Sequence, residues 1–188
     1  MNQAFSGGAV FLVDTLLTLA TIFFLLRFVL QAVRADFYNP ITQGIVRLTD
    51  PVLKPLRRVV PPAGGLDSAA LLLCILLQTL LLLFLGAAPV TAVLAAGFRL
   101  VDLLLDLYWF ALIILVVASW IAPGNRHPGL ELLYQVTEPV VAPFRRLIPP
   151  MGGLDLSIIF VFLALSLVAN YLLPGITLEL GLYPAVYG

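Results

Sequence analysis

Long apolar runs alternate with shorter amphipathic stretches along this chain. Four runs are apolar over a length typical of a membrane span: residues 9–33, 68–88, 103–121 and 156–173. A helix of about 20 residues crosses the ~30 Å hydrocarbon core of a bilayer. The pattern therefore predicts an all-α, polytopic membrane protein with about four transmembrane helices. Residues 90–100 are moderately apolar and fit either an interfacial stretch or the beginning of the third span.

A different pattern lies between the spans of each pair. From Ile41 to Leu56, apolar residues recur at helical spacing among Gln, Arg, Asp and Lys. This predicts a short amphipathic helix in the membrane interface. Because proline lacks a backbone donor and disrupts a helix interior, we expect Pro51 and Pro55 to make the end of this segment irregular. Residues 129–144 repeat the pattern.

The stretch 49–67 occurs a second time at 137–155, with twelve of nineteen positions identical and a constant offset of 88 residues. The shared positions include Pro51, Pro55, Arg57, Arg58, Pro61, Gly65 and Asp67 in the first copy, and Pro139, Pro143, Arg145, Arg146, Pro149, Gly153 and Asp155 in the second. A match of this kind indicates a tandem duplication. The chain then divides into repeats 1–90 and 91–188. Each repeat holds two spans, so the repeats have the same, parallel orientation.

Composition and charge add a topology to this picture. The chain is 62% hydrophobic and 11% charged, whereas a soluble domain is roughly half apolar and a quarter charged. Eight of its ten basic residues lie in the connections 34–67 and 122–155. Because basic residues remain on the cytoplasmic side, we expect both connections to face the cytoplasm and both termini to face outward. The net charge of zero gives no indication of a nucleic-acid partner.

The repeated motif resembles the signature of the YggT family, also called YlmG, in reading Pro51-x-x-x-Pro55-x-Arg57-Arg58-x-x-Pro61 followed by Gly65-Leu66-Asp67. The two copies and the stretch Asp36-Phe37-Tyr38-Asn39-Pro40 resemble the proteobacterial form. Both copies lack a proline that family members often carry after the aspartate. The resemblance implies an integral membrane protein of a bacterium. Together with the charge distribution, it predicts a multi-pass protein of the inner membrane with periplasmic termini. Family members are linked to osmotic-shock tolerance, potassium handling or cell division, and plastid relatives to haem attachment on a b-type cytochrome.

The candidate binding residues are the motif arginines Arg57, Arg58, Arg145 and Arg146. Guanidinium groups present several donors to a phosphate, so these side chains fit anionic lipid headgroups or an acidic partner. They equally fit anchors that fix the topology. Asp67 and Asp155 fit two roles, as caps of the following helices or as partners of the arginines in their own motif copy.

Arg27 is the intramembrane charge of the chain. An ionised group inside an apolar run is costly and often functional, although Arg27 is also close enough to the end of its span to extend to the interface. Asp14, near the opposite end of that span, is expected at the interface.

Other polar side chains fall within the third, second and fourth spans. Arg99, Asp102 and Asp106 share one helix face and are expected to form a solvated, mutually paired helix start, with a cation vestibule as the alternative. Gln78 and Asn170 are expected to form hydrogen bonds between helices.

The sequence contains no motif for catalysis or cofactor binding. Its one histidine, His127, lies in a turn without the neighbours that a zinc site needs, and it has no C-x-x-C-H, Walker or G-x-G-x-x-G segment. We therefore expect a non-enzymatic protein without cofactors that supports osmotic-shock tolerance and potassium homeostasis. The alternative is an assembly or scaffold factor for cytochrome maturation or cell division. Expected partners are anionic lipid headgroups and either a membrane protein or further copies of the chain.

Overall fold

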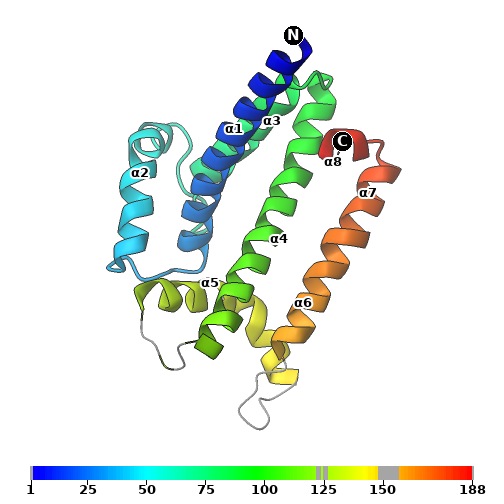
Figure 1. Cartoon of the computed structure of the whole chain (residues 1–188). Coiled ribbons are helices and arrows are strands. Elements are labelled where there is room, and N and C mark those ends of the chain that lie inside the picture. Colours follow the sequence, from blue (N-terminus) through cyan, green and yellow to red (C-terminus); the bar gives the residue numbers. More distant parts are fainter. Residues whose placement is uncertain (1, 122–123, 125–126, 148–156, 188) are drawn as a thin grey trace.

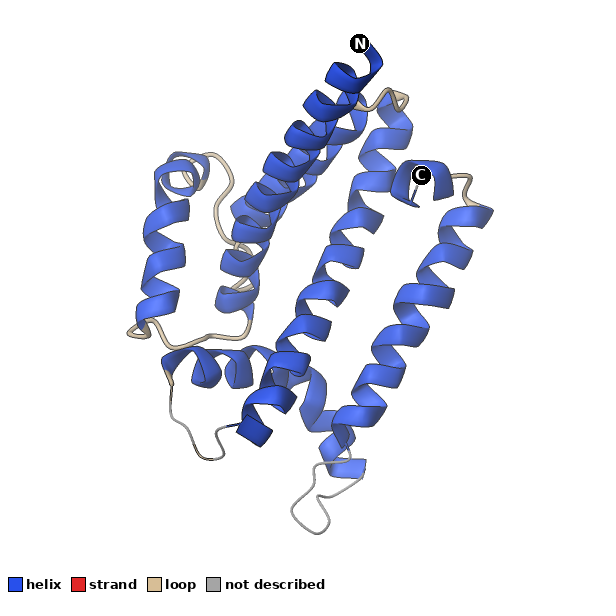
Figure 2. Cartoon of the chain, viewed as in Figure 1, coloured by secondary structure: helices blue, strands red, loops and turns tan. Residues whose placement is uncertain are grey.

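The computed structural model describes residues 2–121, 124, 127–147 and 157–187, and this part of the chain is helical without a strand (Figure 2). The elements are α1 (Asn2–Ala32), α2 (Pro40–Leu56), α3 (Ser68–Phe84), α4 (Pro89–Ile121), α5 (Pro128–Leu147), α6 (Ser157–Leu167), the π-helical turn η1 (Val168–Leu172), α7 (Leu173–Glu179) and α8 (Tyr183–Tyr187). The predicted all-α membrane class is confirmed. Gly7–Ala32, Pro89–Ile121 and Ser157–Glu179 are long and apolar enough to cross a bilayer, and Ser68–Phe84 is a shorter apolar helix.

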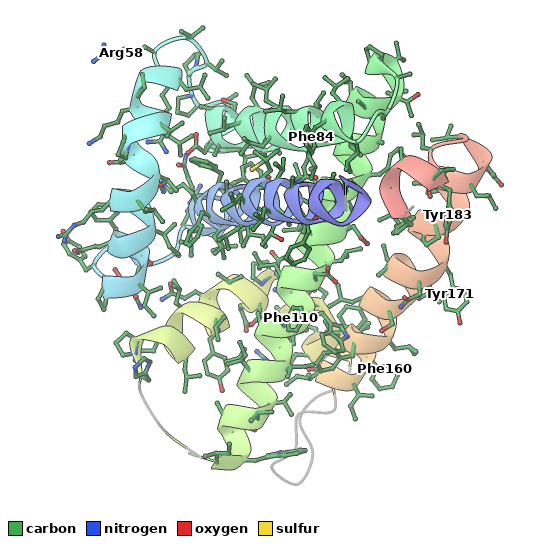
Figure 3. The ribbon with its side chains drawn as sticks, turned by 45° about the horizontal axis from the view of Figure 1, so that its top comes forward. Arg58, Phe84, Phe110, Phe160, Tyr171 and Tyr183 are labelled. Atoms are coloured by element: carbon green, nitrogen blue, oxygen red, sulfur yellow. The ribbon has the colours of Figure 1, made fainter. Side chains whose placement is uncertain are left out.

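The long helices run alternately in opposite directions, and α3 packs against both α1 and α4 (Figure 1). Both termini lie at one end of the bundle, while the last turns of α1 and α4 and the first turns of α2 and α5 lie toward the other. The two amphipathic helices therefore begin at the same end. In Figure 3, α2 runs across the direction of α1 and α3, although it follows the general direction of α4 in both Figure 1 and Figure 3. The amphipathic helix that crosses the end of α4 in Figure 1 is α5.

The predicted irregular segment after Pro51 is wrong, because α2 remains helical through Pro51 and Pro55 to Leu56. The two prolines are four residues apart and lie on the exposed side of the helix. The carbonyls that they leave unpaired are therefore accessible to water or lipid headgroups. The second copy behaves in the same way, with Pro139 and Pro143 inside α5.

The third span is much longer than predicted, because α4 is continuous from Pro89 to Ile121. Residues 90–100 thus belong to this helix and not to a separate interfacial stretch. Ala92, Ala95 and Ala96 are fully buried there, in a cluster that includes Val186 of α8. Small side chains allow helices to approach closely, which explains why a moderately apolar segment continues the span.

Two other helix ends differ from the predicted boundaries. The second span ends at Phe84, because Gly86 adopts a positive φ of 92° and turns the chain. The fourth apolar helix was expected to end before Pro174 but continues to Glu179. The π-turn η1 precedes that proline, with the Leu173 amide donating to the carbonyl of Val168. Such a widened turn is a known way for a helix to accommodate a disrupted hydrogen-bond ladder.

The duplication is visible in individual hydrogen bonds of α2 and α5. Thr49 Oγ1 donates to the carbonyl of Ile45 at 2.7 Å, and Thr137 Oγ1 donates to that of Leu133 at 2.8 Å, which is the same bond 88 positions later. Both threonines are buried, and so is the aligned pair Leu53 and Val141. Each amphipathic helix thus turns the same face of its motif toward the bundle.

Candidate functional site

Arg57 and Asp67 form an ion pair that closes the first copy of the motif. Arg57 Nη2 donates to Asp67 Oδ2, and Arg57 Nε donates to Oδ1 at 3.3 Å. The Asp67 side chain is fully buried, whereas that of Arg57 is 23% exposed. This hydrogen bond raises the pKa of Arg57 above its ordinary value, so Arg57 stays charged. Asp67 also caps α3 by accepting from the Ala70 amide at 3.3 Å. It therefore has both of the roles considered for it.

The loop between these two residues is fixed by short-range hydrogen bonds. The amides and carbonyls of Ala63 and Leu66 pair with each other, and Gly64 and Gly65 between them adopt positive φ angles of 61° and 83°. Side chains rarely tolerate this region, so the glycines are required by the turn. Ser68 Oγ donates to the carbonyl of Pro61 at 2.6 Å and ties the loop to the start of α3.

In the second copy, Arg145 pairs with a glutamate of its own helix. Arg145 Nη1 donates to both carboxylate oxygens of Glu138, at 3.0 and 2.9 Å. In the first copy the aligned Asp50 pairs with Lys54 at 3.0 Å. Position 142 is alanine where the first copy has Lys54, so Glu138 has no such neighbour and is available to Arg145. Pro149, Gly153 and Asp155 lie outside the described residues.

The remaining motif arginines, Arg58 and Arg146, are exposed. Figure 3 shows Arg58 beyond the end of α2, projecting away from the bundle. The four motif arginines thus divide into two that pair with carboxylates, Arg57 and Arg145, and two that face outward. The outward-facing pair is the part of the motif that can reach a phosphate or an acidic partner.

The two repeats are joined directly where their amphipathic helices begin. The Asp36 amide donates to Gln135 Oε1 at 2.8 Å, and Asn39 Nδ2 donates to the carbonyl of Pro128 at 2.7 Å. Asn39 caps α2 through the Ile41 amide. His127, 88 positions later, accepts from the amide two residues on in the same way, at 3.1 Å. The single histidine is therefore a turn residue. Within the described residues, no group of three His, Cys, Asp or Glu could hold a metal ion.

Arg27 is half-buried near the end of α1, and its Nε is buried without a hydrogen-bond partner among the described residues. The charged groups that act on it most strongly are Arg57, Asp67 and Asp50. Both of these carboxylates pair with other cations, Asp67 with Arg57 and Asp50 with Lys54. Arg27 instead lines a cavity together with Arg34 and Thr42, two residues that sequence reasoning missed. Thr42 had one usable signal: it is polar, yet it shares the buried face of α2 with Val46 and Leu53.

Polar groups inside the spans are mostly satisfied by near neighbours. Gln78 Nε2 of α3 donates to Thr21 Oγ1 of α1 at 3.1 Å, and both side chains are fully buried. This is the interhelical hydrogen bond expected for Gln78. Asn170, in contrast, donates within its own helix to the carbonyl of Ser166 at 2.9 Å. Ser119 likewise bonds the carbonyl of Val116.

Replacing Gln78 with leucine is expected to change the free energy of unfolding by less than about 1 kcal/mol, since hydrogen bonds between membrane helices contribute little on average. Gln78 Oε1 has no partner in the part of the chain that the structure describes, and Thr21 Oγ1 keeps its bond to the carbonyl of Leu17 at 2.8 Å. Gln78→Ala should cost more, about 2 kcal/mol, because it leaves a cavity. Unfolding in mixed micelles measures both, and equal losses would contradict this account.

Arg99 was expected to pair with Asp102 and Asp106 on its own helix face, but its ion pair in the structure is with another helix. It forms an ion pair with Asp14 of α1, with 3.6 Å between Arg99 Nη2 and Asp14 Oδ1. The longer α4 also places Arg99 ten residues inside the helix and not at its start. The pair therefore links the first and third spans within the bundle.

The amino-acid sequence of this chain is similar to a known protein family and to several bacterial proteins. The sequence model of the CCB3/YggT family matches residues 6–88 and 94–176. An uncharacterized protein of Pseudomonas aeruginosa is 46% identical over 169 residues, which cover 86% of each chain. An uncharacterized Vibrio alginolyticus protein from the proC 3′ region is 41% identical over 88% of this chain and 93% of its own. The uncharacterized YggT of Escherichia coli K12 is 35% identical over 90% and 97%. No solved structure matches.

Proposed function

The chain belongs to the CCB3/YggT family, and from this premise we propose that it is a non-enzymatic protein of the bacterial inner membrane that supports osmotic-shock tolerance and potassium homeostasis. It acts by organising other membrane components at the α2–α5 surface, which faces the cytoplasm. The observation that carries this proposal is the direct connection of the two amphipathic helices through Asn39 and Pro128. That connection joins the two amphipathic helices where they begin, and each helix carries an exposed arginine at its other end, Arg58 and Arg146.

The polar groups of the spans argue against ion conduction by a single chain. A conduction path needs polar side chains that face a shared cavity. Here Gln78 pairs with Thr21, while Asn170 and Ser119 bond carbonyls of their own helices. Purified protein in liposomes is expected to pass no potassium under an osmotic step. Potassium flux above that of empty liposomes would contradict the organising role.

A complementation experiment tests the exposed arginines. In cells that lack the protein, the wild-type chain is expected to restore growth after a hyperosmotic shift, whereas Arg58→Ala with Arg146→Ala is not. The matched control replaces both arginines with lysine. Lysine keeps the positive charge that orients the protein but lacks the rigid fork of guanidinium donors. Full rescue by the lysine variant would reduce the role of Arg58 and Arg146 to topology.

The same surface also fits an assembly or scaffold factor for a membrane complex, such as one for cytochrome maturation or cell division. A photo-crosslinking residue at position 58 in intact cells distinguishes the two roles by what it captures. Reporter fusions at both termini test the orientation, and cytoplasmic signals at both would contradict the assignment of α2 and α5 to the cytoplasmic face.

A further inference from the structure

A cavity of about 370 Å³ lies where the end of α1, the first turn of α2 and the motif loop meet. Its polar lining consists of Arg27, Gln31 and Arg34 from the end of α1, Thr42 from α2 and Gly65 from the loop. Gln31 Nε2 donates to the Gly65 carbonyl at 3.3 Å. The exposed motif arginines Arg58 and Arg146 do not line this cavity.

Two polar atoms in the wall of the cavity are buried and have no partner in the described part of the chain. They are Arg27 Nε and Thr42 Oγ1, and Thr42 is only 3% exposed. A buried donor without an acceptor is destabilising, and native proteins rarely retain one without a bound water, ion or ligand. Arg27 and Thr42 line the same cavity.

Arg34 supplies an independent signal. It ends α1 with φ 54°, the one positive φ at a non-glycine residue among the described residues. The Ala35 amide bonds the Leu30 carbonyl and the Arg34 amide bonds that of Gln31, which is a helix end that normally uses glycine. An arginine at this position is strained, and such strain concentrates at functional sites. Arg34 also lines the cavity.

The charge of the cavity is positive. The carboxylates whose charges act on Arg27 are Asp67 and Asp50, and these pair with Arg57 and Lys54. Asp36, in the neighbouring loop, accepts from the Tyr38 amide at 2.9 Å and does not line the cavity. Two arginines, Arg27 and Arg34, therefore line a partly open cavity whose lining contains no carboxylate.

We propose that this cavity binds a phosphate group, and that its source is the headgroup of an anionic phospholipid. Arginine donates several hydrogen bonds to phosphate oxygens, and the threonine hydroxyl adds a neutral donor. Arg27 lies about two turns from the end of α1, near the depth at which headgroups lie. Leu30 separates the cavity from an apolar one of about 610 Å³ lined mainly by α1, α4 and α5, which suits an acyl chain. This site does not depend on the proposed role.

Titration of the full-length protein in nonionic detergent with short-chain phosphatidylglycerol tests the proposal. Saturable binding is expected for the wild type, and about tenfold weaker binding for Thr42→Val and Arg34→Gly, since each loses a hydrogen bond to a charged group. Arg47→Ala is the matched control, because Arg47 is an exposed arginine of α2 outside the cavity. Equal loss in Arg47→Ala and Arg34→Gly, or no loss in Arg34→Gly, would overturn the proposal.

Two further measurements separate lipid binding from a purely structural role of Arg34 and from binding of free phosphate. Arg34→Gly is expected to raise the melting temperature of the unliganded protein by about 2 to 4 °C, since glycine relieves the strain, while it weakens lipid binding. A purely structural residue would not show opposite effects. Short-chain diacylglycerol, which lacks phosphate, should not bind, and equal binding of it refutes the phosphate site. Competition by inorganic phosphate at equal affinity would support the phosphate site but refute a lipid as its source.

Discussion

Replacing Arg57 with alanine is expected to lower the free energy of unfolding by about 3 kcal/mol, because it leaves a buried carboxylate without its cation. Asp67 is fully buried, and its bond to the Ala70 amide cannot compensate for the missing charge. The loss is measured by unfolding in mixed micelles. The neighbouring Arg58→Ala is the matched control, since Arg58 is exposed, and it should change stability by less than about 0.5 kcal/mol.

A second substitution shows whether the loss comes from the buried charge. Asp67→Asn keeps a side-chain oxygen for the α3 cap and removes the negative charge. Adding it to Arg57→Ala should therefore recover part of the lost stability. If the double variant is instead less stable than Arg57→Ala by the full cost of Asp67→Asn alone, the two residues do not interact energetically, and the ion pair does not stabilise the loop.

Replacing Leu53 with alanine in the wild-type protein is expected to lower the free energy of unfolding by about 3 kcal/mol, because apolar surface is lost and a cavity remains. Leu53 is fully buried against Ala69 and Ala70 of α3, with Phe24 and Phe28 of α1 packed around the same cluster. The small alanines leave room that only a large side chain on α2 fills. Thus Leu53 is the main apolar contact that holds α2 across the first helical pair.

The adjacent residue provides the control for this prediction. Val52 is 46% exposed, so Val52→Ala should change stability by less than about 0.5 kcal/mol. Limited proteolysis gives a second readout, because the loop 57–67 should become cleavable in Leu53→Ala if α2 detaches. Equal stability of the two variants would mean that α2 is held by the bilayer and not by its packing.

The helices and the duplication were predictable because both depend on the spacing of residues along the chain. The apolar runs have span length, and the offset of 88 residues aligns Thr49 with Thr137. Their matching hydrogen bonds follow from that alignment. The continuation of helices through Pro51 and Pro174 was less predictable. A proline penalises a helix interior, but burial of nearby residues such as Leu53 and Leu173 can outweigh that penalty.

By itself, the sequence determined the class of this protein, the number of apolar helices and the repeated arginine-proline motif, since each depends on residue type and spacing along the chain. Only the tertiary structure showed that Arg57 meets Asp67 across its loop and that Arg145 meets Glu138 of its own helix. It also brought Arg27, Arg34 and Thr42 to one cavity. Such contacts depend on how loops and helices are placed in space, and on whether each charge finds a partner once water is removed.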